Sequence, residues 1–175
     1  MICRSHYTGA LTTREHDTYN NETGEYLEKI KAFCDGKIGF TCSSFDLFHP
    51  GHVIMLADSK SRCDVLVVGL QRDPTLDRPD TKNMPIQTYE ERKIMIESCK
   101  YVDYVVEYST ENDLYNILMK LKPDTRILGS DWKGKNYTGY DIKDISIYWH
   151  DRSGHEYSTT NLRKRIYREE KRISE

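Results

Sequence analysis

Two histidines lie three residues apart in a segment that can bind phosphate. The segment reads His49-Pro-Gly-His52 and runs directly into a helical pattern over residues 51–60. The first turn of a helix leaves backbone N–H groups unpaired and carries the positive end of the helix dipole, so it attracts anions. Pro50 suits the first helical position, and Gly51 allows a phosphate to approach the backbone closely. The pattern indicates phosphate chemistry beside two imidazoles.

Two other interpretations of His49-x-x-His52 are open. The segment could be an ordinary helix start or one half of a metal site. No cluster of Cys or His residues stands nearby to complete a zinc tetrahedron, although Cys42 and Asp46 are close in the sequence. A predicted strand before the segment and a helix after it favour phosphate binding.

Three hydroxyl residues, Ser158, Thr159 and Thr160, precede a basic helical pattern near the C-terminus. At a helix start, their hydroxyl and backbone N–H groups can hold the β- and γ-phosphates of a nucleotide. The same residues also serve as ordinary N-caps, which need no further function. The basic run that follows is typical of a solvated face, although Arg163 is placed where it could touch a phosphate.

A second glycine-rich segment, Gly129-x-x-x-x-Gly134-Lys135, is similar to a P-loop but lacks two of its parts. Asn136 stands where a P-loop has the Ser or Thr that binds magnesium, and Tyr137-Thr-Gly139 is a poor helix start. The sequence also contains no Gly-x-Gly, which excludes the dinucleotide-binding fingerprint.

From residue 37 onward, short β-branched runs alternate with helical patterns, which is typical of βαβ units and a parallel sheet. Thr88-Tyr-Glu-Glu91 has the form of a capping box, and Thr110 is a candidate N-cap. We expect strands over residues 37–42, 64–70, 104–108, 126–129 and 145–149, and helices over 51–60, 88–99, 110–121 and from 158 onward.

The first 36 residues differ from the rest. Up to Gly24 there is no sustained periodicity, residues 20–24 have the composition of a loop, and residues 25–33 can form a short amphipathic helix. We therefore expect an N-terminal appendage (1–36), packed on the domain or on a second subunit, followed by one catalytic domain (37–175).

Composition narrows the class of protein. The 175 residues carry a net charge of −2, which argues against a dedicated nucleic-acid binder. No apolar run is long enough to span a bilayer, and the start lacks the apolar stretch of a signal peptide. The five cysteines are scattered and form no Cys-x-x-Cys pair, so we expect reduced thiols in a cytoplasmic protein with no membrane partner.

The segment Phe45-Asp-Leu-Phe-His-Pro-Gly-His52 resembles the HxGH signature of the nucleotidylyltransferase superfamily. Further stretches resemble, in the same order, those of glycerol-3-phosphate cytidylyltransferases; they cover residues 89–93 with 101–103, 129–135 and 157–160. There are two departures. Ser43-Ser44 replaces the usual Gly-Thr, and the segment from Arg152 to Thr160 is one residue longer and lacks the family's glycine, which leaves the role of Arg152 open.

The resemblance implies a Rossmann-like three-layer α/β sandwich with a five-stranded parallel sheet and a site where the first and fourth strands end. It implies that His49 and His52 are catalytic and that Lys82, in the polar loop 77–85, follows the moving charge. A loop lysine is otherwise simply solvated, and Arg72 or Arg78 could take its place. The implied nucleotide-binding residues are Ser43, Ser44, Phe45, Gly51, Asp131, Trp132, Tyr157, Ser158, Thr159 and Thr160.

The acceptor would be bound by Asp46 and Arg92, although Arg92 could equally pair with Glu91 or Glu97 on a helix surface. The implied reaction joins CMP from CTP to a small phosphorylated alcohol, glycerol 3-phosphate as first choice, and releases pyrophosphate. Mg²⁺ would be held by the nucleotide phosphates, with no metal-binding residue in the chain. A homodimer is also implied. The alternatives are an adenylyltransferase acting on a sugar phosphate or cofactor precursor, and a non-catalytic nucleotide-binding module.

Overall fold

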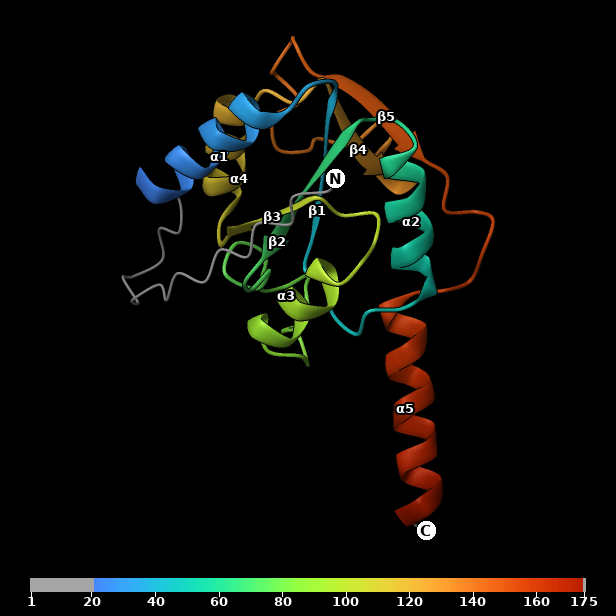
Figure 1. The fold of residues 1–175 in the computed structure, drawn as a ribbon. Coiled ribbons are helices and arrows are strands. Elements are labelled where there is room, and N and C mark those ends of the chain that lie inside the picture. The colour runs from blue at the N-terminus through green and yellow to red at the C-terminus, as the bar shows by residue number, and fades with distance from the viewer. Residues whose placement is uncertain (1–20, 175) are drawn as a thin grey trace.

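The structure is a computed structural model and describes residues 21–174 (Figure 1). Its centre is a sheet of five parallel strands in the order β3-β2-β1-β4-β5. The strands are β1 (Ile38–Ser43), β2 (Val65–Gln71), β3 (Tyr104–Tyr108), β4 (Thr125–Gly129) and β5 (Ser146–His150). The strand order reverses between β1 and β4, and ligands bind such sheets beyond the carboxyl ends of the strands at that point. The predicted fold class is confirmed.

Helices cover both faces of the sheet, which gives the three layers. On one face lie α1 (Asn21–Phe33) and α4 (Glu111–Leu121), side by side in Figure 1. On the other face lie α2 (Pro50–Lys60) and α3 (Tyr89–Glu97). Because both faces are covered, β2 is apolar without alternation, and its Leu66, Val67 and Val68 are fully buried.

Helix α1 corrects one expectation from the sequence. It begins at Asn21, so residues 21–24 are helical instead of forming the predicted loop. Leu27 and Ile30 are buried against α4, and this tertiary packing outweighs the turn preference of the Asn and Gly residues in this segment. Residues 1–20 of the predicted appendage lie outside the described residues, and the domain boundary at residue 36 stays a prediction.

Side-chain caps set the starts of α3 and α4 as expected. The Thr88 hydroxyl accepts a hydrogen bond from Glu91 N while the Glu91 carboxylate accepts one from Thr88 N. Thr110 and Asp113 form the same reciprocal pair at α4. Both capping boxes hold their helices in place against the sheet, and the loops before them carry Lys82 and part of the site.

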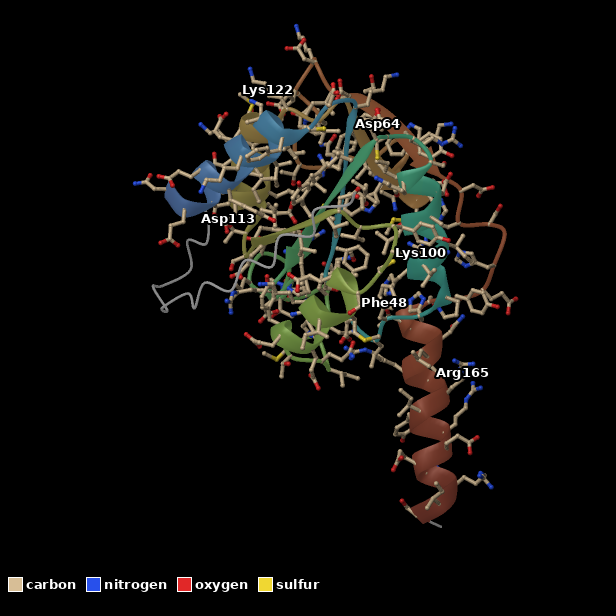
Figure 2. All side chains as sticks on the ribbon, viewed as in Figure 1. Phe48, Asp64, Lys100, Asp113, Lys122 and Arg165 are labelled. Atoms are coloured by element: carbon tan, nitrogen blue, oxygen red, sulfur yellow. The ribbon has the colours of Figure 1, made fainter. Side chains whose placement is uncertain are left out.

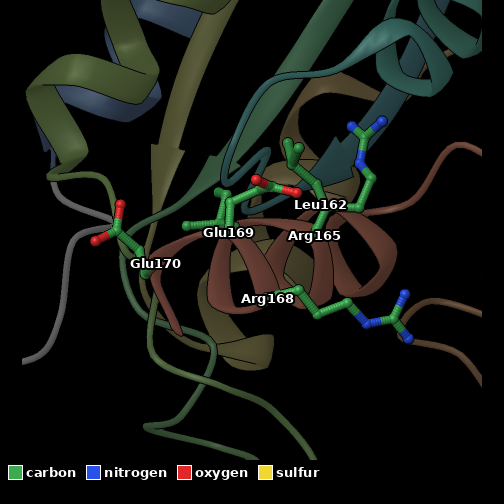
Figure 3. A pocket seen from close by; sticks show the side chains of 6 residues that line it. Leu162, Arg165, Arg168, Glu169 and Glu170 are labelled. Carbon is green, nitrogen blue, oxygen red and sulfur yellow. The ribbon is translucent and has the colours of Figure 1, made fainter. Parts of the chain in front are cut away.

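Helix α5 (Thr159–Ser174) projects away from the body of the molecule (Figure 1). None of its described residues is buried, and Ile166, Tyr167 and Ile173 are exposed. Side chains such as Arg165 extend from it into solvent (Figure 2). A shallow hollow on this helix is lined by Leu162, Arg165, Ile166, Arg168, Glu169 and Glu170 (Figure 3).

Within residues 21–174, no helix combines the length and the apolar character that crossing a bilayer requires. The four cysteines in this part of the chain, Cys34, Cys42, Cys63 and Cys99, are free thiols, as expected, and Cys3 lies outside it.

Candidate active site

The turn between β1 and α2 holds His49 and His52 in a reciprocal cap. His49 is the N-cap of α2; its Nδ1 accepts a hydrogen bond from Gly51 N at 3.1 Å. Nδ1 of His52 accepts one from His49 N at 3.4 Å. His52 N donates to the carbonyl oxygen of His49 at 2.9 Å. The first N–H groups of α2 are therefore already paired inside the turn, contrary to the expectation that they face an anion directly.

The same hydrogen bonds fix the tautomer of each ring. An Nδ1 that accepts a hydrogen bond carries no proton, so a neutral imidazole bears its proton on Nε2. Both histidines thus present an Nε2–H donor. At the start of α2 the hydrogen-bond donors are therefore the two imidazole side chains and not the backbone N–H groups. Both rings lie near the positive end of the α2 dipole.

Packing keeps both rings uncharged. The rings of His49 and His52 are stacked with centroids 3.8 Å apart, and Phe48 stacks on the other side of His52 at 5.6 Å. Burial, with the neighbouring His49 and Arg152, lowers the pKa of His52 to about 3. Burial, with the charges of Arg152 and His155, also lowers the pKa of His49. At neutral pH the site contains two neutral donors.

Phe45 packs against His52 of this pair. Its backbone is left-handed (φ 50°), and its fully buried ring lies edge-on to His52 with centroids 5.2 Å apart. Because the side chain is enclosed, the predicted contact of Phe45 with a nucleotide is limited to its backbone. Ser43, the last residue of β1, and Ser44 lead into this turn, and both side chains are partly exposed.

The start of α5 lies against the histidine turn. The Thr159 hydroxyl donates to the carbonyl oxygen of Asp46 at 3.1 Å and lies 3.4 Å from Nε2 of His49. The hydroxyl oxygen of Ser158 accepts a hydrogen bond from Asn161 N, so Ser158 is an N-cap. Thr160 and Tyr157 are exposed.

Asp46 holds three segments together. Its carboxylate accepts hydrogen bonds from Ile86 N and Gln87 N and pairs with Arg163 at 2.7 Å. Although burial raises it, these hydrogen bonds keep the pKa of Asp46 below its ordinary value. Arg163, a candidate phosphate contact from the sequence, is thus engaged with Asp46. These contacts give Asp46 a positioning role and do not favour its predicted contact with the acceptor.

Arg92 is also a positioning residue. It is 1% exposed, and its guanidinium donates to the carbonyl oxygens of Ser44, Gln71, Arg72 and Gln87. Backbone carbonyls take four of its five N–H donors, and within the described residues it forms no ion pair with Glu91 or Glu97. This enclosure by tertiary packing does not favour the predicted contact with the acceptor.

The carboxyl ends of β4 and β5 carry a second charged pair. Asp131, in the short 3-10 helix η1 (Ser130–Trp132), pairs with Arg152 at 3.2 Å. A Cβ at Gly129 would lie 2.4 Å from Oδ1 of Asp131, so this glycine makes room for the carboxylate. The charge of Arg152 also lowers the pKa of both histidines, so Arg152 lies near the histidine pair as well as beside Asp131. Trp132 is partly exposed beside this pair.

Lys82 is exposed in the loop between β2 and α3. Partial desolvation and the nearby Arg78 cation lower the pKa of Lys82, whereas the Asp131 carboxylate acts to raise it. The influence of Asp131 and Arg152 on Lys82 means that this loop faces the same end of the sheet. The two alternative cations are engaged, since Arg72 pairs with Glu107 and Arg78 with Glu111.

One residue at the site was missed by the sequence analysis. His155 lies over Gly51: a Cβ at Gly51 would be 3.1 Å from Cε1 of His155. Its ring also packs on Tyr157 with centroids 5.4 Å apart. The extra residue in the segment from Arg152 to Thr160 was the available signal, because a longer loop can fold back over the helix start.

No group of three or more His, Cys, Asp or Glu side chains within residues 21–174 is arranged to hold a metal ion. Any Mg²⁺ at this site would need ligands from a bound nucleotide.

Comparison with known proteins shows the family. A family model described as cytidylyltransferase-like matches residues 40–165, which include every site residue described above. The bifunctional protein HldE of Aliarcobacter butzleri (strain RM4018) is 35% identical over 153 residues, covering 86% of this chain and 32% of that protein. HldE of Paramagnetospirillum magneticum is 39% identical over 106 residues, covering 61% of this chain and 22% of that protein. The chain thus spans a third or less of these relatives.

Solved structures share the fold. The lipopolysaccharide core biosynthesis protein from Thermoplasma volcanium GSS1 has a TM-score of 0.55 and 26% identity, covering 70% of this chain and 100% of that one. The pantoate-beta-alanine ligase from Francisella tularensis, solved with a βγ-ATP ligand and β-alanine, has a TM-score of 0.58 and 19% identity, covering 80% of this chain and 70% of that one. The second likeness concerns the fold alone.

Proposed function

The chain belongs to the cytidylyltransferase-like family, and we propose that it transfers a nucleotidyl group from a nucleoside triphosphate to a small phosphorylated acceptor. The observation that carries this proposal is the stacked, neutral pair His49 and His52, whose Nε2–H donors lie where β1 and β4 end. Such donors suit a phosphate that gains charge during reaction.

In the proposed reaction an oxygen of the acceptor phosphate attacks the α-phosphorus in line. The bond from this phosphorus to the bridging oxygen breaks, and pyrophosphate leaves with the electron pair. Catalysis then rests on positioning and on stabilisation of charge, without a protein nucleophile. Each fixed donor of this kind is worth about 3 kcal/mol in other enzymes.

Each group has a distinct part in this proposal. The Nε2–H groups of His49 and His52 would donate to the α-phosphate and its bridging oxygen. Thr159 is in contact with His49, so the start of α5 would lie along the β- and γ-phosphates. Lys82 would follow the charge between acceptor and α-phosphate, because its ammonium is exposed on a flexible stem.

Mg²⁺ would enter with the nucleotide. The described site offers no carboxylate cluster, and Mg²⁺ in such sites is held largely by substrate phosphates and water. Bound there, the ion would neutralise charge on the triphosphate. We expect Mg²⁺ alone to leave the thermal unfolding midpoint unchanged, and Mg²⁺ with a triphosphate to raise it.

For the substrates, our first proposal is CTP with a phosphorylated alcohol such as glycerol 3-phosphate. The order of four motifs along the chain and the cytidylyltransferase-like family support it. Asp131 and Trp132 would lie beside the base or ribose. Acceptor recognition then falls to groups other than Asp46 and Arg92, which are engaged within the fold.

A second candidate is transfer of AMP from ATP to a sugar phosphate. It is favoured by the likeness to the lipopolysaccharide core biosynthesis protein, since a polysaccharide is assembled from activated sugars. The HldE relatives align with this region of the chain, and their name does not refer to CTP.

A paired assay separates these candidates. CTP and ATP are each tested with glycerol 3-phosphate and with a set of sugar 1-phosphates, and pyrophosphate release is measured. Turnover with CTP and a phospho-alcohol supports the first proposal, and turnover with ATP and a sugar phosphate replaces it with the second. No release with any pair, together with tight triphosphate binding, would leave a non-catalytic nucleotide-binding module.

We also propose a homodimer built on α5. This helix has six Lys or Arg residues against two Glu, and its exposed Ile166 and Ile173 cover nothing in the described chain. Helix α3 is complementary: it exposes Ile94 and Met95 and carries Glu90, Glu91 and Glu97. In a two-fold dimer, each α5 can lie on the partner's α3.

Analytical ultracentrifugation tests this assembly. Ile166→Lys with Ile173→Lys should convert a dimer to a monomer, whereas Lys164→Gln, a control on the same helix, should leave it dimeric. A monomeric unmodified chain at tens of micromolar would contradict the proposed dimer.

A further inference from the structure

His155 has buried polar atoms that the fold leaves without a partner. Both ring nitrogens are inaccessible to solvent, and neither finds a hydrogen-bond partner anywhere in residues 21–174. A neutral imidazole has one N–H donor and one acceptor lone pair. Buried groups of this kind are normally hydrogen-bonded, and leaving them unpaired is costly. The unpaired ring needs an explanation from outside the fold itself.

The position of the ring points to a ligand. Cε1, the carbon between the two nitrogens, would lie 3.1 Å from a Cβ at Gly51, so both nitrogens are close to the start of α2. His155 is also close enough to His49 to influence the pKa of that ring. His155 therefore fills the space that Gly51 leaves open, beside the two histidines of the turn.

The backbone N–H groups at the start of α2 are not available to bind an anion. Gly51 N already donates to His49, and His52 N donates to the His49 carbonyl. Pro50 has no N–H group. An anion at this helix start must therefore be held by side chains, and His155, whose two buried ring nitrogens have no partner in the described chain, is available beside His49 and His52.

We propose that His155 binds the triphosphate of the nucleotide, as a third imidazole beside His49 and His52. This inference rests on the proposed function, since it assumes that a triphosphate occupies the site. It also gives a role to the longer segment between Arg152 and Thr160, which brings His155 over Gly51 and against Tyr157. The ligand class is a polyphosphate, with one phosphate oxygen accepting the N–H of His155.

Binding measurements on the full chain test the proposal, with the α,β-methylene analogues of CTP and ATP and inorganic tripolyphosphate as probes, each with Mg²⁺. His155→Phe keeps an aromatic ring against Gly51 and Tyr157 but removes both nitrogens. We expect it to weaken binding of these probes about 10- to 100-fold, the loss expected for a hydrogen bond to a charged group. His155→Gln, which restores an N–H donor, should recover part of the loss. Glu156→Gln, an exposed neighbour in the same loop, should bind within about twofold of the unmodified chain.

Two results would overturn the proposal. If His155→Phe binds the probes as tightly as the unmodified chain, the ring serves packing alone. If it binds them more tightly, His155 obstructs the anion position. The proposed function fails separately: if no acceptor supports pyrophosphate release but His155→Phe still weakens tripolyphosphate binding, the phosphate contact stands and nucleotidyl transfer falls. If turnover occurs and is unaffected by His155→Phe, nucleotidyl transfer stands and the phosphate contact of His155 falls.

Discussion

The imidazole rings of His49 and His52 stack with centroids 3.8 Å apart, and each accepts a backbone hydrogen bond at Nδ1 from the turn that joins them. A helix start usually leaves backbone donors for an anion, whereas here the two rings accept hydrogen bonds from those donors and carry Nε2–H groups themselves, that of His49 lying 3.4 Å from the Thr159 hydroxyl. The His-Pro-Gly-His turn is thereby a cap and a donor pair at once.

The stability of the chain should fall in acid because of His52. The pKa of His52 is about 3 in the folded chain and about 6.5 when unfolded. The unfolded chain therefore binds the extra proton, so the stabilisation is complete above pH 6.5 and is lost as the pH falls toward 3. Urea unfolding at pH 7, 6, 5 and 4 should show the unmodified chain losing about 1 kcal/mol per pH unit more than His52→Gln below pH 6. Parallel pH profiles for the two proteins would contradict this, since the carboxylates titrate in both.

Removing an imidazole should affect turnover far more than folding. His52→Ala removes one Nε2–H donor, so we expect kcat to fall by about 10²- to 10³-fold, as for a lost oxyanion donor. Circular dichroism should show a folded protein, because the β1–α2 turn keeps the His49 cap. The control is Ser61→Ala, just after α2, which should retain full turnover. A His52→Ala variant that keeps most of its activity would place the chemistry elsewhere.

Arg92 should prove important for stability, not for acceptor binding. Arg92→Lys keeps the charge but cannot reproduce hydrogen bonds to four carbonyl groups, so we expect a loss of about 3 kcal/mol in the free energy of unfolding. The change Lys93→Gln at the partly exposed neighbour, which removes only a surface ion pair with Glu97, should cost about 0.5 kcal/mol or less. Measured at a temperature where Arg92→Lys is folded, its KM for the acceptor should change less than about threefold. A large rise in KM with unchanged stability would restore the acceptor contact.

Lys82, in contrast, should be important for turnover and not for stability. Its side chain is exposed, so Lys82→Met should leave the free energy of unfolding within about 0.5 kcal/mol of the unmodified chain. If its ammonium follows charge in the transition state, kcat should fall about 100-fold. Lys100→Met, another exposed lysine, is the matched control (Figure 2). Equal activity of the two variants would show that Lys82 is only solvated.

Local signals in the sequence were sufficient for most of the fold. The capping box at Thr88, the N-cap at Thr110 and the apolar run of β2 depend on residues close together in the chain, and they appear as predicted. The start of α1 was missed because Leu27 and Ile30 gain their helical preference from packing on α4. Similarly, Asp46 and Arg92 are buried by contacts with residues distant in the sequence. Asp46, for example, accepts a hydrogen bond from Ile86, 40 residues away, so the sequence suggested substrate contacts for both residues.

His155 shows the same limit at the site. Its place over Gly51 results from a loop that crosses from β5 to α5, and no local pattern reports where such a loop lies. The His49-Pro-Gly-His52 turn, in contrast, was recognisable because strand, turn and helix follow one another directly.

The most direct test of direct nucleotidyl transfer follows the α-phosphate. The chain is mixed with α-³²P-labelled CTP or ATP and Mg²⁺, with and without a phosphorylated acceptor, and the products are separated. We predict that the label stays in the triphosphate without acceptor, and with acceptor moves into a joined nucleotide product as an equal amount of pyrophosphate appears, with none bound to protein. Label that stays on the chain would show a covalent intermediate, label in a nucleoside diphosphate would show transfer of the γ-phosphate, and either result would contradict the proposed reaction.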